Sequence, residues 1–524
     1  MESAYDAVVV GSGFGGGITA CRLAERGLRV CVLERGRRFG PGDFPDRPAQ
    51  APRMFWHPRL NPGGFFDLRI MRDVAVLTGA GVGGGSLVYA NVQLRAPDDV
   101  FDDPAWPAGI DARVLRPYYD RTEAALQPRE TPADPALPKV RAFDAMAARA
   151  GYASERLPIA VHFGEDRLHP FSGAFQQGCE NLGRCDIGCP RNARNTVDIT
   201  YVARAEQHGA EVFPLHEVHT IDAPPHDGGP WRVGFRDLQY RIDGEVTAPL
   251  LVLAAGTLGS SRLLLRNRRR LARLSPALGT RFSGNGDALA LAIDPQEPAV
   301  AGARADFGPT MTSRIDLDAE QQLMVADGGL PTSFGGLLQI VRGVRAITGL
   351  GRVALHAKNV AAKVGLSDRH VTHRNMTLKD RTPIADTLVF LNLGRDAADG
   401  RMRLTPLFGC FDIRWSKDAS AALFERMRRI AGELAQAAGA GSFFALDAGP
   451  LGKFITVHPL GGCPMSDDPR TGVVDEYGKV HGYDGLYVLD GSIVPTALGV
   501  NPSKTIAALA ERGAERLAAE YAPS

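Results

Sequence analysis

The hydrophobic pattern near the amino terminus alternates between short apolar runs and a helical repeat. The runs Ala7–Val10 and Val30–Leu33 have the length and composition of buried strands, and residues 18–26 between them have helical spacing. Gly27 follows this helical segment at the position where helices commonly end. This order of strand, helix and strand predicts a βαβ unit with a parallel sheet.

Similar patterns recur far along the chain. Apolar runs at residues 250–255, 388–393 and 486–489 predict further buried strands, and residues 503–518 have helical spacing. At the start of that helix, Pro502 suits the first helical position and Asn501 suits the N-cap. The glycine-rich residues 78–92 have apolar neighbours on both sides, which favours a buried ordered loop over a flexible linker.

Composition limits the class of protein. The 524 residues correspond to roughly three domain-sized units. The 60 basic and 59 acidic residues give a net charge of +1, which argues against a nucleic-acid-binding protein. Glycine is in excess, with 60 residues, or about 11% against the usual ~7%. The excess points to local roles for the glycines.

The first glycine cluster follows the first predicted strand. Gly11 permits a tight turn, Gly13 lets the backbone approach a pyrophosphate, and Gly16 lets helix and strand pack closely. The helix that follows offers free N–H groups to phosphates. Glu34, at the end of the second strand, can accept ribose hydroxyls and disfavours a 2′-phosphate. The pattern predicts a dinucleotide site and leaves FAD and NAD open.

Several motifs together resemble one enzyme family. The first glycine cluster, the GAGVGGGS run at residues 79–86, His458-Pro-Leu-Gly-Gly and Asn501-Pro-Ser are similar to those of the glucose–methanol–choline (GMC) oxidoreductases. Within the family, the likeness is closest to bacterial cholesterol oxidase-like flavoproteins. The resemblance implies an α/β fold with a Rossmann-like FAD-binding domain (βαβ, parallel sheet), interleaved with an α+β substrate domain on an antiparallel sheet. The expected boundaries are 1–100, 195–300 and 450–524 for the first domain, and 101–194 and 301–449 for the second.

The resemblance also selects FAD over NAD, because a second half-site around Asp490 and the helix after Pro502 suits a flavin. The glycine-rich loop carries no histidine for attachment, so non-covalent binding of FAD is expected. The cofactor-binding residues that the resemblance implies are Gly11, Gly13, Phe14, Gly16, Glu34, Gly79, Gly84, Gly85, Ser86, Asn91, Val92, Val218, Ala255, Gly256, Asp490, Gly491, Asn501 and Pro502.

The resemblance places His458 and Asn501 at the substrate hydroxyl. An imidazole with a pKa near ~6.5 can accept the hydroxyl proton, and an amide can orient the same oxygen. The implied reaction is oxidation of an alcohol, secondary, apolar and sterol-like, to a ketone by hydride transfer to flavin N5, with oxygen or another acceptor regenerating the flavin. Members that oxidise sterols keep a carboxylate as a second base, and Asp327 is the candidate for it. The alternative for Asp327 is an acid in a surface turn.

The cysteines Cys179, Cys185 and Cys189 form the least settled motif. Three thiolates could hold an iron–sulfur cluster, which would suit an alternative function, a dehydrogenase of a polar alcohol or sugar that passes electrons to a non-oxygen acceptor. However, close C-x-x-C pairs are missing and a fourth ligand is not near. Buried thiols or one disulfide are therefore favoured, and no metal is expected.

The sequence predicts a cytoplasmic protein. The first apolar run is too short for a secretory signal, and the long uncharged stretch at residues 74–94 is too rich in glycine and polar residues for a membrane span. Residues 342–381 carry nine Lys or Arg against two Asp. That segment fits a basic lip in transient contact with a membrane surface, although a solvated helix face is favoured.

Overall fold

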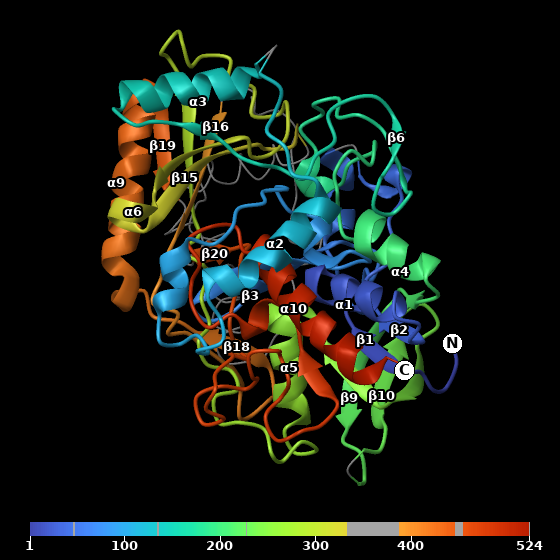
Figure 1. Cartoon of the computed structure of the whole chain (residues 1–524). Coiled ribbons are helices and arrows are strands. Elements are labelled where there is room, and N and C mark those ends of the chain that lie inside the picture. The colour runs from blue at the N-terminus through green and yellow to red at the C-terminus, as the bar shows by residue number, and fades with distance from the viewer. Residues whose placement is uncertain (46–47, 134–135, 227, 333–386, 446–453, 523–524) are drawn as a thin grey trace.

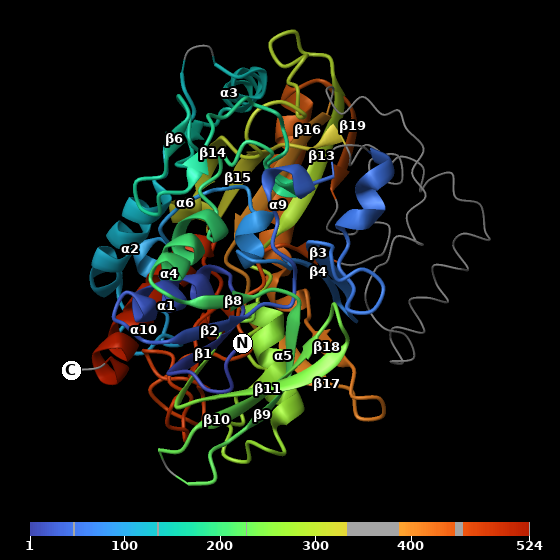
Figure 2. The same cartoon turned by 90° about the vertical axis from the view of Figure 1, so that its right-hand side faces the viewer.

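A computed structural model gives the fold and describes residues 1–45, 48–133, 136–226, 228–332, 387–445 and 454–522. The predicted basic segment at residues 342–381 lies outside these residues. The molecule has two interleaved parts, one built on a parallel sheet and one on an antiparallel sheet (Figures 1 and 2). The α/β fold class predicted from the sequence is therefore confirmed.

The parallel sheet joins strands from three distant regions of the chain. Its order is β21-β12-β1-β2-β8. The strands are β1 (Ala7–Val10), β2 (Val30–Leu33), β8 (Glu211–Phe213), β12 (Leu250–Leu253) and β21 (Leu486–Val488). Every residue of β1, β2, β12 and β21 is buried, which explains why each reads as an unbroken apolar run.

Three helices accompany this sheet, and one of them begins earlier than the sequence predicts. α1 spans Phe14–Ala24 and starts four residues early, because its first turn contains glycines that carry no hydrophobic signal. α5 spans Gly256–Asn267. α10 spans Ser503–Tyr521, with Pro502 rather than Asn501 at the N-cap and no side-chain cap hydrogen bond. The side-chain amide of Asn501 instead contacts His458.

The antiparallel sheet has the order β19-β13-β16-β15-β14-β5. α3 (Pro138–Arg149) and α9 (Ala421–Ala437) cover one of its faces (Figure 1). The strands are β5 (Glu155–Arg156), β13 (Ala288–Pro295), β14 (Ser313–Leu317), β15 (Leu323–Gly328), β16 (Thr387–Gly394) and β19 (Ala440–Ala445). β13 is an inner strand of this sheet and pairs with both β16 and β19.

Smaller sheets flank these two. One contains β9 (His216–Asp222), β10 (Trp231–Asp237) and β11 (Ile242–Ala248), and another contains β3 (Phe66–Ile70), β4 (Val74–Gly79) and β20 (Phe454–Thr456). The remaining elements are α2 (Ala112–Leu126), α4 (Ala203–Gln207), α6 (Asp318–Gln321), β6 (Arg167–Leu168), β7 (Phe175–Gln176), β17 (Arg401–Leu404) and β18 (Phe411–Arg414). Within the described ranges, no helix has the length and apolar character needed to cross a membrane.

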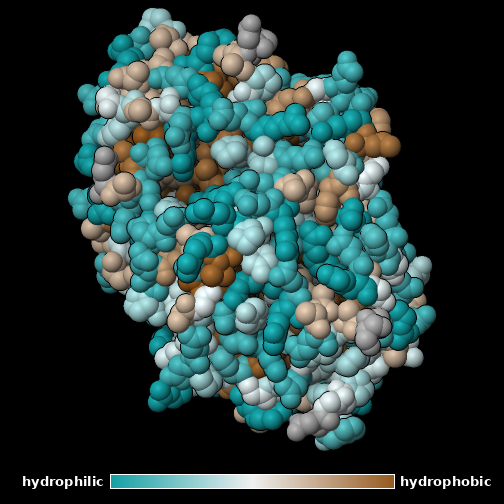
Figure 3. Space-filling view, in the orientation of Figure 1, coloured by the Kyte–Doolittle hydropathy of each residue, from teal (hydrophilic) through white to brown (hydrophobic). Residues whose placement is uncertain are grey.

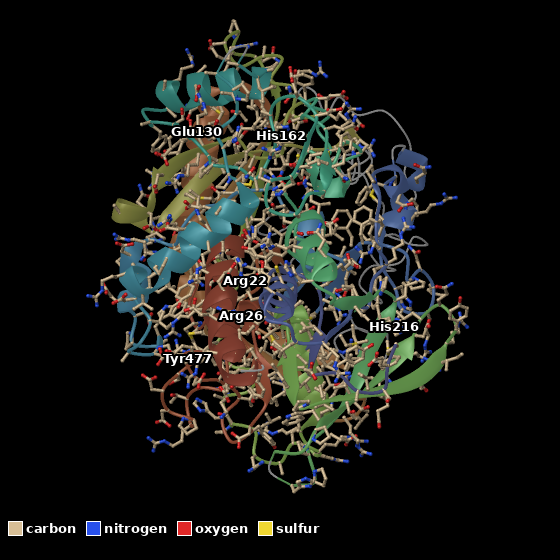
Figure 4. The ribbon with its side chains drawn as sticks, turned by 45° about the vertical axis from the view of Figure 1, so that its right-hand side comes forward. Arg22, Arg26, Glu130, His162, His216 and Tyr477 are labelled. Atoms are coloured by element: carbon tan, nitrogen blue, oxygen red, sulfur yellow. The ribbon has the colours of Figure 1, made fainter. Side chains whose placement is uncertain are left out.

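A buried charge network holds α1 against α10. The side chain of Glu511 on α10 has no exposed surface, and its carboxylate accepts hydrogen bonds from Arg22 Nε and Nη2, each at 2.8 Å, and from the Tyr201 hydroxyl at 2.9 Å. Figure 4 shows Arg22 on α1 beside α10. The same burial, together with the Glu511 carboxylate, raises the pKa of Tyr201.

We expect Glu511→Gln to lower the free energy of unfolding by about 2–4 kcal/mol, because Arg22 loses its fully buried carboxylate partner and keeps only the partly exposed Glu25. The measurement is chemical denaturation with FAD in fixed excess. The matched control is Glu515→Gln on the same helix, whose half-exposed pair with Arg121 should contribute less than about 1 kcal/mol. Equal losses in the two variants would contradict the assignment.

Candidate active site

One cavity of about 1210 Å³ lies between the parallel sheet and the antiparallel sheet. Both glycine-rich loops, the start of α5, the start of α10 and strands of the antiparallel sheet contribute to its lining. This volume exceeds the ~300–1,000 Å³ of most small-molecule pockets, so it has room for a dinucleotide and a second molecule. The face of the molecule drawn in Figure 3 is mostly hydrophilic, with hydrophobic atoms visible mainly in recesses.

The first glycine loop has the close approaches that its sequence predicts. Gly11 has a φ of +98°, and a Cβ at this position would lie 2.4 Å from the carbonyl oxygen of Ala254. A Cβ on Gly16 would lie 1.9 Å from the carbonyl oxygen of Gly11, so helix and strand pack through it. Gly13 has no such internal contact and instead lines the cavity. Its missing side chain leaves space for a ligand, which fits a dinucleotide.

The carboxylate of Glu34 connects the two glycine loops at the cavity wall. It accepts hydrogen bonds from the Ser12 hydroxyl at 2.7 Å, the Ser12 amide at 3.1 Å and the Gly36 amide at 2.9 Å. The Gly81 amide of the second loop lies 3.3 Å away. Glu34 is therefore buried and fixed at the end of β2 while it faces the cavity.

Arg194 fixes the second glycine loop from behind. Its buried guanidinium donates to the carbonyl oxygens of Ser86, Leu87 and Tyr89 at 2.6, 2.9 and 3.0 Å, and to Asn91 Oδ1 at 2.8 Å. Asn91 has a φ of +65°, a conformation that asparagine tolerates. The prediction of an ordered loop is correct, and a buried cation at its centre accounts for the order.

Two helices, α5 and α10, begin at the far end of the cavity. Asp490 is buried, and its carboxylate accepts from the Gly256 amide at the start of α5 at 2.9 Å and from the Ser260 hydroxyl at 2.5 Å. Burial raises the pKa of Asp490. Pro502 and Ser503 also line the cavity, so the positive end of α10 opens toward it.

His458 lies between a carboxylate and an amide. Its Nδ1 is 2.7 Å from Asp287 Oδ1, and its Nε2 is 3.2 Å from Asn501 Nδ2. An ionised carboxylate only accepts hydrogen bonds, so Nδ1 carries the proton and Nε2 presents a lone pair. Asn501 Oδ1 is buried and has no hydrogen-bond partner among the described residues. All three side chains line the cavity. Nε2 as an acceptor and the Asn501 Nδ2 amide as a donor together suit a hydroxyl group.

The turn at residues 283–287, here called the organising turn, positions both His458 and Asn501. Asn285 accepts from the amides of Leu498 and Gly499 at 2.8 and 3.1 Å, and donates to the carbonyl oxygen of Val500 at 2.8 Å. Asp287 Oδ2 accepts from the backbone amide of His458 at 3.1 Å. The turn thereby holds the chain immediately before Asn501 and the backbone at His458.

A buried carboxyl supports the organising turn from below. Asp396 accepts hydrogen bonds from the Ser283 hydroxyl and the Gly286 amide, each at 2.9 Å. Burial raises the pKa of Asp396 to about 6. The carboxylate of Asp396 thus holds the organising turn against the end of β16, so the turn is anchored to the antiparallel sheet.

The structure brings most of the predicted cofactor residues together around the cavity. Those that line it are Gly11, Gly13, Phe14, Glu34, Gly79, Gly84, Gly85, Val92, Val218, Ala255, Gly256, Asp490, Gly491, Asn501 and Pro502. Gly16, Ser86 and Asn91 are not among the lining residues. Gly16 serves packing, the Ser86 hydroxyl bonds to Gly83 and Val197, and the Asn91 side chain bonds to Arg194.

Asp327, predicted as a second base, does not reach the cavity. Alternation along β15 directs Leu323, Val325 and Asp327 to the face that α3 and α9 cover. The Asp327 carboxylate accepts from the Thr312 amide and hydroxyl, each at 2.6 Å, and lies 3.0 Å from Lys139 Nζ. It is neither a surface acid nor a cavity base, and we assign it no role in the reaction.

Three residues of the site could not be identified from sequence patterns. Asp287 and Arg194 act through hydrogen bonds to distant segments, and no local motif marks such partners. The string Ser-Gly-Asn-Gly-Asp at residues 283–287 is a turn signal that could have marked the organising turn. Asp186 lines the cavity, and burial raises its pKa to about 6. It lies between Cys185 and Cys189, and no motif of its own marks it.

The three cysteines of the sequence motif lie near one another without forming a bond. Cys179, Cys185 and Cys189 are free thiols, and Cys185 is buried. Burial raises the pKa of Cys179 to about 12 and also raises that of Cys185. Over the residues that the structure describes, no group of three or more His, Cys, Asp or Glu side chains has an arrangement that could hold a metal ion.

Comparison with known proteins identifies similar chains. Family models described as GMC oxidoreductase match residues 5–268 and 410–510. A cholesterol oxidase of Mycobacterium tuberculosis is 34% identical, with 98% of this chain and 91% of that protein covered. A cholesterol oxidase of Acinetobacter baumannii is 28% identical, with 99% and 95% covered. The solved structure of pyridoxine 4-oxidase from Mesorbium loti has a TM-score of 0.61 at 18% identity, with 98% of both chains covered, and supports the fold alone.

We expect Arg194→Lys to weaken FAD binding by at least about tenfold and to lower the thermal midpoint. A lysine ammonium cannot reach the four acceptors that the guanidinium bonds, so the loop loses charge-assisted hydrogen bonds. FAD affinity of the apoprotein is measured by flavin fluorescence. Arg191→Lys, at a partly exposed pair with Glu180, is the control that should change little. Unchanged FAD affinity in Arg194→Lys would refute this role.

Proposed function

The chain belongs to the GMC oxidoreductase family of FAD-dependent enzymes that oxidise CH–OH groups, and on that premise we propose that it oxidises an apolar, sterol-like secondary alcohol to a ketone. The observation that carries the proposal is the pairing of His458 Nε2 with Asn501 at the cavity wall, with Asp287 fixing the imidazole from behind. We further propose that FAD is held non-covalently.

The residues at this wall suit removal of a hydroxyl proton. In the proposed complex the substrate hydroxyl replaces the direct contact between Asn501 Nδ2 and His458 Nε2. It donates to Nε2 and accepts from Nδ2. This geometry fixes the oxygen and leaves the carbinol C–H free to face the cofactor. Asp287 stabilises the imidazolium that forms when His458 takes the proton. Bound FAD supplies the acceptor for the hydride.

The lining of the cavity supports an apolar substrate. Several of its hydrophobic side chains lie on or beside the antiparallel sheet or in the segment before His458: Leu289, Met311, Leu330, Val389, Leu391, Ile455 and Val457. Ile455 and Val457 are 40% and 44% exposed, so the cavity has an apolar side open to solvent. Burial of apolar surface contributes roughly 25 cal/mol per Å², which favours a large hydrophobic alcohol over a sugar.

Relatives give a substrate class consistent with this lining. The relatives named above are cholesterol oxidases, and a long-chain-alcohol oxidase of Arabidopsis thaliana is also similar, at 24% identity. We propose oxygen or another small acceptor as the final oxidant. A cytoplasmic location and transient contact with a membrane surface stay predictions from the sequence.

Anaerobic mixing of the purified holoprotein with an alcohol panel tests the proposed substrate class. We expect a 3β-hydroxysterol to bleach the flavin absorbance, and glucose and other small polar alcohols to leave it unchanged over the same time. If only polar alcohols bleach the flavin, the alternative of a polar-alcohol dehydrogenase replaces the proposal. Iron analysis of the same sample then reports whether Cys179, Cys185 and Cys189 hold a cluster.

We expect Asp287→Asn to reduce kcat by roughly 10²–10⁴-fold. The introduced amide retains an oxygen for the backbone donors but presents an N–H to Nδ1, so the imidazole must carry its proton on Nε2 and loses its basic nitrogen. The flavin spectrum should be unchanged. Asp294→Asn, at an exposed position on β13, the strand that follows Asp287, is the control. Full activity in Asp287→Asn would contradict the mechanism.

A further inference from the structure

The cavity has a charged end that the proposed reaction does not use. Four arginines line it, here called the arginine cluster: Arg35 after β2, Arg69 on β3, and Arg262 and Arg266 on α5. The two α5 residues are four positions apart, so they share one face of the helix. Arg236 and Arg241, near β10 and β11, also line the cavity. Figure 4 shows His216, on the lining strand β9, well away from α10.

The members of the arginine cluster differ in their carboxylate partners. Arg35 Nη1 and Arg69 Nη2 both lie 2.7 Å from Asp67 Oδ2. Arg236, outside the cluster, lies 3.5 Å from Asp243. The charge of Glu217 favours the charged form of Arg262. Within the described part of the chain, Arg262 and Arg266 nevertheless lack the close acid that Arg35 and Arg69 contact.

The surroundings of Arg262 disfavour its positive charge. Its Nε is buried and has no hydrogen-bond partner among the described residues, and within them neither Arg262 nor Arg266 forms an ion pair. Burial, followed by the charges of Arg69, Arg266 and Arg35, lowers the pKa of Arg262 to about 9. A buried cation with like-charged neighbours is destabilising unless an anion compensates it. The cluster thus has the features of an incomplete ion-binding site.

We propose that the arginine cluster binds a phosphate-type dianion. Guanidinium groups bind phosphate oxygens through paired N–H donors, and the four groups converge on one cavity wall from three separate segments. Two sources share this chemistry: the pyrophosphate of FAD, and the phosphate of a second molecule. The second source is favoured, because the amides at the start of α1 already suit the pyrophosphate. The inference requires bound FAD but is independent of which alcohol is oxidised.

Calorimetric titration of inorganic phosphate into the FAD-loaded protein tests the site. In a phosphate-free buffer we expect saturable binding to one site, and no such signal from chloride at equal ionic strength. Arg262→Gln should weaken phosphate binding by at least about tenfold, as expected for a lost hydrogen bond to a charged group. Arg266→Gln, at an exposed position that is expected to leave folding intact, should weaken it as well. Arg268→Gln, exposed beyond α5 and outside the cavity lining, is the matched control.

The affinity of the apoproteins for FAD separates the two sources. If phosphate binds the wild-type holoprotein and Arg262→Gln abolishes this binding while FAD affinity is unchanged, the anion belongs to a second molecule. If phosphate does not bind the holoprotein but Arg262→Gln weakens FAD binding at least about tenfold, the anion is the cofactor pyrophosphate. If phosphate does not bind and FAD affinity is unchanged, the proposal is overturned. None of these measurements involves turnover, so they stand apart from the test of the proposed reaction.

Discussion

The hydrogen bonds of the Asp287 carboxylate connect the two parts of the molecule at the wall of the active-site cavity. The carboxylate is 3% exposed and accepts from the Thr456 hydroxyl, the amides of Val457 and His458, and His458 Nδ1. A buried charge is tolerated only with such a set of donors. Because Asp287 directly precedes β13, the position of His458 depends on the antiparallel sheet. The neighbouring Asn285 imposes the same dependence on the segment before Asn501.

A second constraint is the close approach of backbone segments around the cofactor end of the cavity. A Cβ on Gly15 would lie 1.6 Å from the carbonyl oxygen of Leu489, and one on Gly84 would lie 2.6 Å from the Cα of Gly13. These contacts join the first glycine loop to the carboxyl-terminal strand and to the second loop. Part of the glycine excess therefore arises because segments that are distant in sequence pack backbone to backbone. Arg194 then donates hydrogen bonds to the part of the second loop that follows its glycines.

Features encoded locally could be predicted from the sequence, and features that depend on distant partners could not. β1 and β2 were predicted to the residue, because a buried parallel strand is a plain apolar run. The start of α1 was missed, because glycine carries no periodicity. The residues around Asp327 resemble a turn and led to its prediction as a second base. The pairing of β15 with β16 and β14 decides the face of the sheet on which its side chain lies. Asp287, Arg194 and the arginine cluster depend on contacts between segments far apart in the chain, and single-sequence patterns do not report these.

The proposed reaction depends most directly on Asp287, which holds the proton of His458 on Nδ1 and leaves Nε2 as the acceptor that faces the cavity. Nitrogen-15 NMR of histidine-labelled holoprotein at pH 8 tests this proton position, with His458→Gln used to assign the resonance. We expect a protonated Nδ1 and an unprotonated Nε2 for His458, and a reversal of the two in Asp287→Asn. A proton on Nε2 in the wild-type protein would contradict the proposed role of Asp287.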